Sequence, residues 1–314
     1  MGLSPTPQMR NERVPLYGTM FYYLELSRQD VYPVKVAGPV ETEEMSRNRA
    51  NDLQEEAAGT GTLGKAMAVL EAVAMADRPQ RFTDILQSVR QPRGTLHRLL
   101  GHLVEEGLLV QRRDLSYEPG LRLLKFAYRS WSGNRFRDIA EPHLLRLHEL
   151  TGETVHLGVL RETEIIYVDK VESRQTVRMS SQIGKASPAY CTGIGKAALS
   201  SLSPSELERI AAKLEFRPFT AHTHRSAQSL LAEIEEIRRD GHAFDREEHE
   251  AEICCVAAPI AVREQDLVAG VSVTGPSYRV NMEQLAAWAA DVRRAAAAIE
   301  EEVRIRLGPR REGR

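Results

Sequence analysis

Apolar residues recur at helical spacing in three short segments that begin at Thr62. We expect Thr62 to cap the first helix, which ends at Asp77-Arg78-Pro79. The second begins at Thr83, whose hydroxyl is the expected N-cap, and the third has Pro92 in its first turn and stops at Gly107. The apolar positions are Leu63, Ala66, Met67, Leu70, Val73, Ala74, Ile85, Leu86, Val89, Leu96, Leu99, Leu100 and Leu103.

A hairpin and a connecting helix follow these three segments. Residues 108–111 and 116–118 are rich in β-prone side chains and flank the polar Arg112-Arg113-Asp114, which predicts two paired strands. Residues 121–131 again carry apolar residues at helical spacing, and Ser132-Gly133-Asn134 interrupts them. Three short helices followed by a hairpin are typical of a winged helix-turn-helix.

The rest of the chain mixes strands and helices, which indicates a second domain of α/β type and an α+β protein overall. The sequence contains no run of about 18 consecutive apolar residues, so we expect no transmembrane helix. We expect a helix from Ile139 to Leu150 and a last helix from Asn281. The other expected strands lie near 154–161, 164–171, 176–180, 252–262 and 267–274, and the other expected helices lie near 193–200, 204–213 and 226–240.

The length of 314 residues suits two domains with additional tails. The first sixty residues are polar, Pro-containing and without sustained periodicity, so we expect a disordered extension. Met45 is an alternative start for the chain, shortly before the first convincing helix. The predicted organisation is an extension (1–60), a winged helix-turn-helix (61–120), a linker helix (121–134), a C-terminal α/β domain (135–308) and a tail (309–314).

Charge is distributed unevenly between these parts. The whole chain has a formal net charge of -2, from 42 Lys+Arg and 44 Asp+Glu. Residues 62–137 contain 13 Lys/Arg and 7 Asp/Glu, a net charge of +6, so the remaining residues carry a net charge of −8. An ordinary solvated helical face also carries such charge, but its coincidence with the predicted helix order favours DNA binding.

The third predicted helix has the composition expected of a helix that enters the DNA major groove. Its leucines form one stripe, and the opposite face is small or basic. Arg reads guanine edges or binds phosphate, whereas Thr and His do so more weakly. We expect DNA contacts from this helix, from the preceding helix and from the hairpin tip, at Thr83, Arg93, Gly94, Thr95, His97, Arg98, His102, Arg112 and Arg113.

Several separate segments follow one another in a recognisable order and spacing. They are residues 62–71, 92–100 with 107–109, 187–197, 244–249 leading into 254–260, and 271–276. In these segments the chain resembles the IclR-type bacterial transcriptional regulators, from residue 62 to about 306. One departure is the wing, because Arg113-Asp114-Leu115 lacks the Gly that family wings often carry.

The resemblance implies a winged helix that binds DNA and a GAF-like C-terminal domain that binds a small-molecule effector. Gly193, Ile194, Asp245 and Cys255 match positions that line the ligand pocket in family members. The free N–H groups of Gly193 and Ile194 suit a carboxylate, and Asp245 either accepts a hydrogen bond from a ligand hydroxyl or caps a turn.

Two further pocket residues follow from side-chain alternation in the last predicted strand. Ser272 and Thr274 fall on the face that is small and hydroxylated, opposite the apolar face. A close-packed sheet face under a helix is the alternative interpretation of this pattern. The segment Gly193-Ile194-Gly195-Lys196 is not a phosphate-binding P-loop, because Tyr190 stands where Gly is required and Ala197 where Ser or Thr is required.

The cysteines and histidines raise two alternatives, an enzyme and a metal protein. The three cysteines, Cys191, Cys254 and Cys255, exclude a disulfide scaffold and suit a reducing cytoplasm. A catalytic Cys255 would need a base such as His249, and the sequence does not bring the two together. The spacing of His222, His224 and the cysteines matches no metal site, so both histidines are expected to be solvated, while His156 faces either the pocket or solvent.

We therefore expect a cytoplasmic bacterial transcription factor, bound to the nucleoid when it holds its operator, with no catalytic residues, metal or cofactor and no membrane partner. Its expected partners are a double-stranded DNA operator, a small-molecule carboxylate effector and further copies of the chain, as a homodimer or a dimer of dimers (homotetramer). Two alternatives stay open. One is an enzyme that acts on a small acid through Cys255 or Asp245, and the other is a constitutive DNA-binding protein whose second domain only oligomerises.

Overall fold

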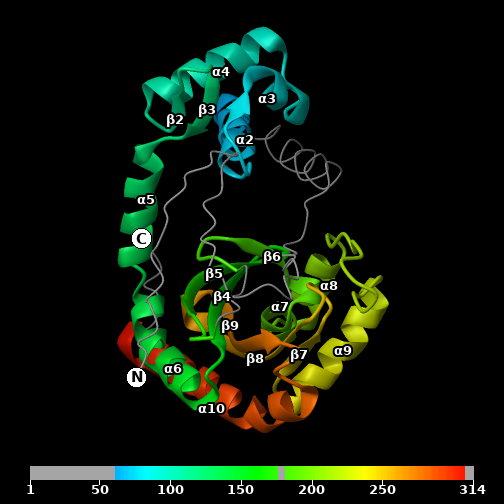
Figure 1. Cartoon of the computed structure of the whole chain (residues 1–314). Coiled ribbons are helices and arrows are strands. Elements are labelled where there is room, and N and C mark those ends of the chain that lie inside the picture. The colour runs from blue at the N-terminus through cyan, green and yellow to red at the C-terminus, as the bar shows by residue number, and fades with distance from the viewer. Residues whose placement is uncertain (1–60, 176–180, 308–314) are drawn as a thin grey trace, which may run out of the picture. The chain divides into compact units, whose positions relative to one another are not determined.

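The computed structural model describes residues 61–175 and 181–307 (Figure 1). The expected extension over 1–60, the expected strand at 176–180 and the expected tail at 309–314 lie outside the described residues. Within the described part, helices and strands alternate in the order expected of an α+β protein, which confirms the predicted fold class. The described helices include none that is long and apolar enough to cross a membrane.

The first folded unit is a three-helix body with a small antiparallel sheet. Its sheet has the strand order β1-β3-β2, and the two-residue strand β1 was not predicted from the sequence. β2 and β3 form the predicted hairpin. The elements are α2 (Gly61–Ala74), β1 (Gln80–Arg81), α3 (Phe82–Ser88), α4 (Arg93–Glu105), β2 (Leu109–Gln111) and β3 (Ser116–Pro119).

The apolar stripe of α4 holds this unit together. Leu96, Leu99 and Leu100 are at most 1% exposed and pack against α2 and α3. Burying a leucine side chain contributes about 1.5–3 kcal/mol, so this stripe fixes which face of α4 is left for solvent. Leu63 and Met67, which the helical pattern placed on the core stripe of α2, are instead 70% and 50% exposed.

The helix starts differ from the predicted ones by one or two residues. Thr62 and Thr83 lie inside α2 and α3 and cap neither helix. The first turn of α3 is closed by Asp84, whose carboxylate accepts a hydrogen bond from the backbone N–H of Arg81 at 3.0 Å. Pro92 is the N-cap of α4 rather than a residue of its first turn.

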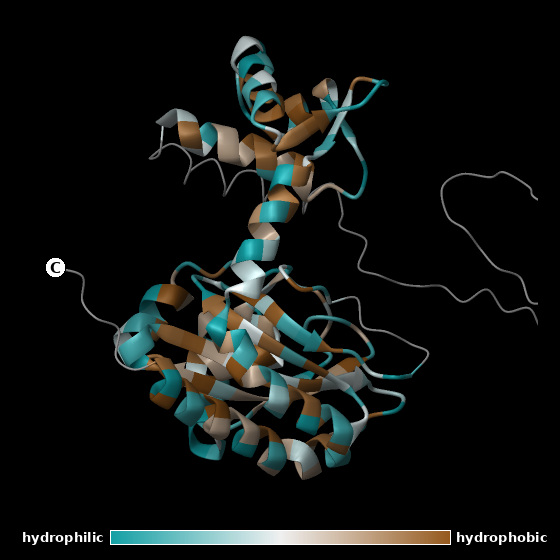
Figure 2. Cartoon of the chain, turned by 90° about the vertical axis from the view of Figure 1, so that its left-hand side faces the viewer, coloured by the Kyte–Doolittle hydropathy of each residue, from teal (hydrophilic) through white to brown (hydrophobic). Residues whose placement is uncertain are grey.

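Two helices follow the winged unit, α5 (Leu121–Ser132) and α6 (Arg135–Thr151). None of the residues of α5 is buried, and Figure 2 shows hydrophilic and hydrophobic residues mixed along it. Asn134 caps α6 by accepting a hydrogen bond from the N–H of Arg137, and Gly152 ends the helix in the left-handed conformation that glycine adopts readily.

The second unit is built on a six-stranded antiparallel sheet with the strand order β6-β5-β4-β9-β8-β7. The short strand β6 and the strand β7 were not predicted from the sequence. The strands are β4 (Thr154–Arg161), β5 (Glu164–Val171), β6 (Ala186–Pro188), β7 (Ala243–Arg246), β8 (Ile253–Val262) and β9 (Leu267–Pro276).

Helices cover both faces of this sheet (Figure 1). The two long helices α6 and α10 bury one face, where Ala269, Val271 and Val273 of β9 lie as alternation predicted. The opposite face packs against α7, which α9 covers in turn. The helices of this unit, besides α6, are α7 (Gly193–Ser200), α8 (Pro204–Ala211), α9 (Ala227–Asp240) and α10 (Met282–Leu307).

Candidate functional sites

The face of α4 opposite the leucines is exposed, as a DNA-reading face requires. Gly94, His97 and Arg98 are exposed there, and Thr95 is half-buried. Arg93 stacks its guanidinium over the ring of Phe82 at 5.4 Å from the centroid, which holds this side chain at the start of the helix. Thr83 on α3 and His102 on α4 are exposed as well.

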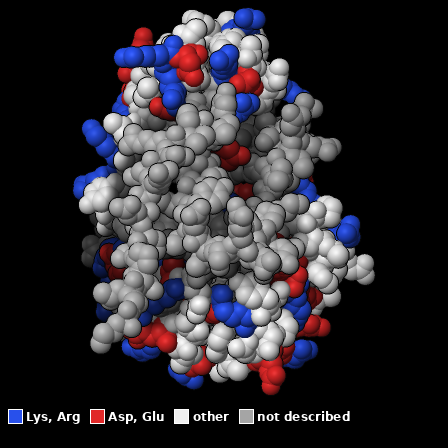
Figure 3. Space-filling model, viewed as in Figure 1, with Lys and Arg blue, Asp and Glu red and all other residues white. Residues whose placement is uncertain are grey.

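Basic and acidic side chains lie close together on this unit. In Figure 3 the Lys and Arg residues at the top of the view gather over the winged unit, with a few acidic residues among them. Arg98 and Arg113 make no ion pair with the described part of the chain. Their charges are therefore available to an external phosphate or base, whereas Arg112 pairs with Glu118 at 3.0 Å.

In the wing turn, a residue other than glycine adopts the left-handed backbone conformation that glycine usually provides. Leu115 takes the left-handed backbone conformation, with φ of 65°, at an exposed position. Asp114 supports the turn by accepting hydrogen bonds from the N–H of Ser116 at 3.2 Å and from its hydroxyl at 2.6 Å. The Ser116 hydroxyl and N–H hold the pKa of Asp114 below its ordinary value. A tight wing therefore forms at Arg112-Arg113 without glycine.

In the second unit, the six predicted effector residues line one pocket. Ser272 and Thr274 come from β9, and Asp245 and Cys255 come from the neighbouring strands β7 and β8. The start of α7 completes the set with Gly193 and Ile194. Residues far apart in sequence meet here because β9 pairs along most of its length with β4 on one side and with β8 on the other.

Backbone packing at the start of α7 depends on glycine. A Cβ atom on Gly193 would lie 2.5 Å from Sγ of Cys255, so a larger residue would displace the helix from the pocket. Thr192 caps the helix by accepting a hydrogen bond from the N–H of Gly195 at 3.2 Å and donates its own hydroxyl to the Pro188 carbonyl at 3.0 Å. The side chain of Ile194 is 2% exposed and fills the space beside Gly158 and Gly270.

Other lining residues were not assigned to the pocket from the sequence, among them His156, Tyr167, Ser187 and His249. His156 of β4 is buried and lies 3.2 Å from the Thr274 hydroxyl and 2.7 Å from the Ser181 hydroxyl, which settles its orientation toward the pocket. From the alternation of side chains along β4, the sequence predicted that His156 faces either the pocket or solvent. Tyr167 and His249 lie in segments whose sequence carries no pattern that distinguishes a pocket from a core.

Burial favours the neutral forms of two histidines and one aspartate in this pocket. It lowers the pKa of His156 to about 3, with a smaller contribution from the Lys170 charge, and lowers that of His249 to about 4. Burial and the Glu248 carboxylate raise the pKa of Asp245 to about 8. At neutral pH the pocket therefore presents neutral imidazoles and a carboxylic acid that can donate a hydrogen bond. Asp245 also caps a turn, since its Oδ1 accepts the N–H of Glu248 at 2.8 Å.

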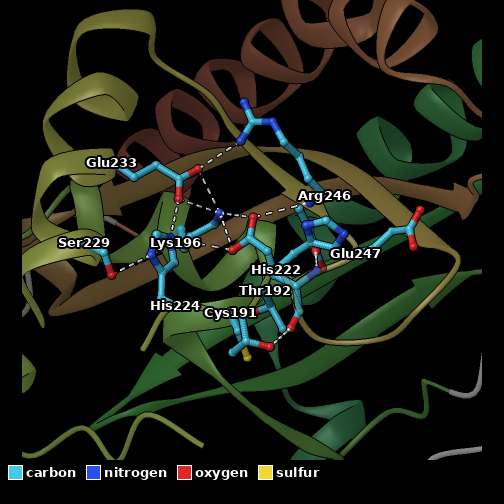
Figure 4. Close-up of polar contacts among 12 residues, drawn as sticks. Cys191, Thr192, Lys196, His222, His224, Ser229, Glu233, Arg246 and Glu247 are labelled. Atoms are coloured by element: carbon cyan, nitrogen blue, oxygen red, sulfur yellow. Dashed lines mark hydrogen bonds and ion pairs between the residues drawn. The ribbon is translucent and has the colours of Figure 1, made fainter. Parts of the chain in front are cut away.

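A buried charged cluster that was not predicted from the sequence surrounds Lys196 (Figure 4). Lys196 of α7 is 0% exposed and contacts the carboxylates of Glu233 and Glu248. His224 is not solvated as expected, because its side chain is 15% exposed and its Nε2 lies 2.5 Å from Glu233 Oε2. His222 is exposed, as expected.

Chemistry at Cys255 has little support in this geometry. Burial raises the pKa of the Cys255 thiol, so the thiolate that a nucleophile requires is disfavoured. Although His249 lines the same pocket, its own low pKa makes it a poor base at neutral pH. The arrangement suits binding of a small polar ligand between a helix N-terminus and neutral donors.

Comparison with known proteins identifies both units. The family model described as "Bacterial transcriptional regulator IclR C-terminal" matches residues 130–301, and the "IclR helix-turn-helix domain" matches residues 62–113. The regulator KdgR of Escherichia coli K12 is 30% identical over 249 residues, which cover 79% of this chain and 94% of KdgR.

Solved structures agree with this assignment. The Thermotoga maritima IclR superposes with a TM-score of 0.59 at 30% identity, over 78% of this chain and 99% of that one. An IclR homologue from Microbacterium hydrocarbonoxydans, solved with 4-hydroxybenzoate, has the same fold, with a TM-score of 0.64 at 24% identity over 78% of this chain and 100% of that one. These relatives are regulators, so the chain acts on transcription and not as an enzyme. The chain belongs to the IclR family of bacterial transcriptional regulators, with an N-terminal helix-turn-helix and a C-terminal effector-binding domain.

Proposed function

We propose that this regulator senses a small organic acid in the pocket at the start of α7 and changes its operator binding in response. The observation that carries the proposal is the meeting of a helix N-terminus with neutral hydrogen-bond donors in one buried pocket. The N–H groups and dipole of α7 favour an anion, and the protonated Asp245 can donate to a carboxylate oxygen instead of repelling it. The cation of Lys185 at the pocket adds attraction for the same charge.

The mixed polarity of the lining favours a small hydroxylated or aromatic acid. Tyr167 and Ile253 offer apolar surface, whereas Ser187, Ser272 and Thr274 offer hydroxyls. The homologue from Microbacterium hydrocarbonoxydans was solved with 4-hydroxybenzoate, an acid of this kind, which supports the class but does not select the compound.

On the DNA side, we propose that α4 lies in the major groove, with Arg98 contacting base edges. Thr83, Arg93, Gly94, Thr95, His97 and His102 would lie around that contact, and Arg112 and Arg113 of the wing would contact the backbone or minor groove. Two observations support this placement. The face of α4 opposite its buried leucines is exposed, and Arg98 and Arg113 make no ion pair with the described part of the chain.

We also propose that the regulator binds DNA as a homodimer, or as a dimer of dimers, through the linker helix. Leu124, Phe126 and Tyr128 on α5 are 65%, 54% and 62% exposed, and no residue of this helix is buried within the chain. A helix with this much uncovered apolar surface is stabilised when a second copy packs against it. We place the protein in the bacterial cytoplasm, nucleoid-associated when bound to DNA, because its target is chromosomal.

A short series of contacts connects the pocket to the linker helix α5. Tyr167 of β5 lines the pocket, and the next residue, Val168, accepts a hydrogen bond at 3.3 Å from the indole N–H of Trp131 at the end of α5. Asp169 then pairs at 3.1 Å with Arg137, whose guanidinium lies 4.0 Å from the centroid of the Trp131 ring. A ligand that shifts β5 would therefore shift the base of the linker helix.

A thermal-shift screen of the full chain against carboxylic acids, including 4-hydroxybenzoate, tests the sensor. A matched amide such as 4-hydroxybenzamide is the control for shape without charge. A ligand at about one hundred times its Kd stabilises the folded state by about 2.7 kcal/mol, so at least one acid should raise the Tm by several degrees and its amide should not. Absence of a shift with every acid would instead support a DNA-binding scaffold whose second domain only oligomerises.

A further inference from the structure

The buried cluster around Lys196 links three separate segments of the effector-binding domain. Its Nζ lies 2.9 Å from both carboxylate oxygens of Glu233 on α9, and 2.5 and 2.7 Å from those of Glu248 in the loop after β7. The Glu248 and Glu233 charges outweigh the effect of burial and raise the pKa of Lys196, so the ammonium persists in the interior. A lysine with no exposed surface is rare and requires such partners.

The ammonium also explains why His224, Glu233 and Glu248 lie together without needing a metal ion. Their ligand atoms lie within 4.8 Å of one another, a spacing that would suit a cation. Nζ of Lys196 already contacts four carboxylate oxygens in that space. The positive charge at the centre of this cluster therefore comes from the chain itself, and the cluster acts as a structural clamp.

Only one of the two carboxylates, that of Glu248, lies on the turn between the pocket residues Asp245 and His249. Glu248 is 4% exposed, its Oε1 accepts the N–H of Arg246 at 3.3 Å, and its own N–H donates to Asp245 at 2.8 Å. Asp245 and His249 on either side of this turn face the pocket. The clamp thus holds the turn by the Glu248 side chain while the turn presents Asp245 and His249 to the ligand.

A second set of bonds holds the same turn from another loop. The hydroxyl of Thr223 donates to the Glu248 carbonyl at 2.6 Å, and that of Thr220 donates to the Glu247 carbonyl at 2.6 Å. These bonds fix the backbone of the turn but not the Glu248 side chain. The Lys196 ion pair is the charged side-chain contact that connects the turn to the first turn of α7, where Gly193 also packs closely against Asp245.

We propose that Lys196 is a positioning residue of the effector pocket, which through Glu248 fixes the Asp245–His249 turn against the start of α7. This inference deepens the proposed sensor function and rests on it for its biological meaning. Lys196 is not among the residues that line the pocket. It sets the distance between the two sides of the pocket, the helix N-terminus on one side and the turn with Asp245 on the other.

The two carboxylates of the clamp provide a matched pair of variants. Glu248→Ala and Glu233→Ala each remove one carboxylate from the same ammonium and leave the other in place. Glu248 lies on the pocket turn, whereas Glu233 reaches it only through the exposed side chain of Arg246 at 3.2 Å. A positioning role therefore predicts a much larger local effect from Glu248→Ala than from Glu233→Ala. Lys196→Met is unsuitable, because two buried carboxylates without a cation would destabilise the whole domain.

The readout is hydrogen exchange of the full-length protein by mass spectrometry, without any ligand, in peptides that cover residues 244–253. Glu248→Ala should speed exchange at the N–H groups of Glu248 and His249 at least tenfold relative to the wild-type chain. Glu233→Ala should leave this turn within twofold, and α10 peptides should stay within twofold in both variants.

Equal exchange of the turn in the two variants, or unchanged exchange in Glu248→Ala, would overturn the positioning role. A parallel rise in α10 would also overturn it, since that result describes general loss of stability. Because no effector enters the measurement, its outcome is separate from that of the carboxylate screen. A positive screen with an unaltered turn would leave the sensor standing and remove Lys196 from it.

Discussion

At the scale of single residues, the pocket is defined by groups whose protonation differs from that on a protein surface. Burial holds His156 and His249 neutral by lowering their pKa values, and holds Asp245 neutral by raising its pKa to about 8. The protonation of Asp245 matters most for binding, because the ionised form of Asp245 would repel the proposed ligand.

Asp245→Asn should change how stability depends on pH. The folded-state pKa of Asp245, about 8, lies above its ordinary value, so the folded chain binds a proton that the unfolded chain lacks and loses stability as pH rises toward 8. The histidines act only below their ordinary pKa of about 6.5, where their neutral folded forms cost stability as pH falls. Between pH 6.5 and 8 the wild type should therefore lose about 1–2 kcal/mol relative to Asp245→Asn, as measured by urea unfolding. Parallel curves for the two proteins over this range would show that Asp245 is ionised throughout.

Arg98→Ala should weaken operator binding by about 1–3 kcal/mol, because it removes the arginine on α4 that has no partner in the described chain. The measurement is fluorescence anisotropy at 150 mM salt, with a DNA site recovered by affinity selection from a random library. Arg98→Lys is the matched variant, since it keeps the charge and loses the forked guanidinium. If Arg98→Ala binds the selected site as tightly as the wild type, α4 does not read the operator through Arg98.

At the scale of elements, the sequence predicted most helices and long strands correctly because their apolar spacing reflects a one-sided core. It missed β1, β6 and β7, which are two to four residues long and gain their strand character only from pairing with distant segments. For the same reason the pocket was found in part. Motif positions located Asp245 and Cys255, whereas His156 and Tyr167 join them only through strand pairing. Lys196 was missed because its burial depends on Glu233 and Glu248, 37 and 52 residues away.

The wing is an element whose two arginines differ in their surroundings. Arg113→Ala should reduce the slope of log K against log salt by about 1 and should weaken binding similarly on selected and random DNA. Arg112→Ala should have a smaller effect, because Glu118 already neutralises part of the Arg112 charge at 3.0 Å. Titrations of both DNAs at several salt concentrations measure this. An effect of Arg113→Ala confined to the selected sequence would mean that the wing reads bases.

The linker helix is the element proposed to join two copies of the chain. Leu124→Glu combined with Tyr128→Glu places two charges on one exposed apolar face of α5, at i and i+4, and should shift the protein toward monomers in sedimentation at micromolar concentration. Lys125→Glu alters the charge of the same helix without removing apolar surface and should leave the assembly intact. An unchanged sedimentation coefficient for the double variant, with the helix content preserved, would exclude α5 from the interface.

At the scale of the whole molecule, the part of the chain that binds DNA and the part that binds the effector carry net charges of opposite sign. The segment 62–137 carries a net charge of +6, and the rest carries −8, so the near-neutral total conceals a DNA-binding part. The helix-turn-helix binds DNA and the C-terminal domain binds the effector, as in the family to which the chain belongs. Regulation requires that the effector bind the DNA-competent and DNA-incompetent states with different affinities.

The measurement that tests this account most directly is the affinity of the full-length protein for its selected operator, with and without a saturating concentration of the acid identified by thermal shift. The account predicts a change in Kd of at least fivefold, in the range of ordinary allosteric coupling, and loss of that change in a Trp131→Ala variant that still binds both partners. An identical operator Kd with the pocket empty and filled would contradict the account, because the domain would then bind an acid without regulating DNA.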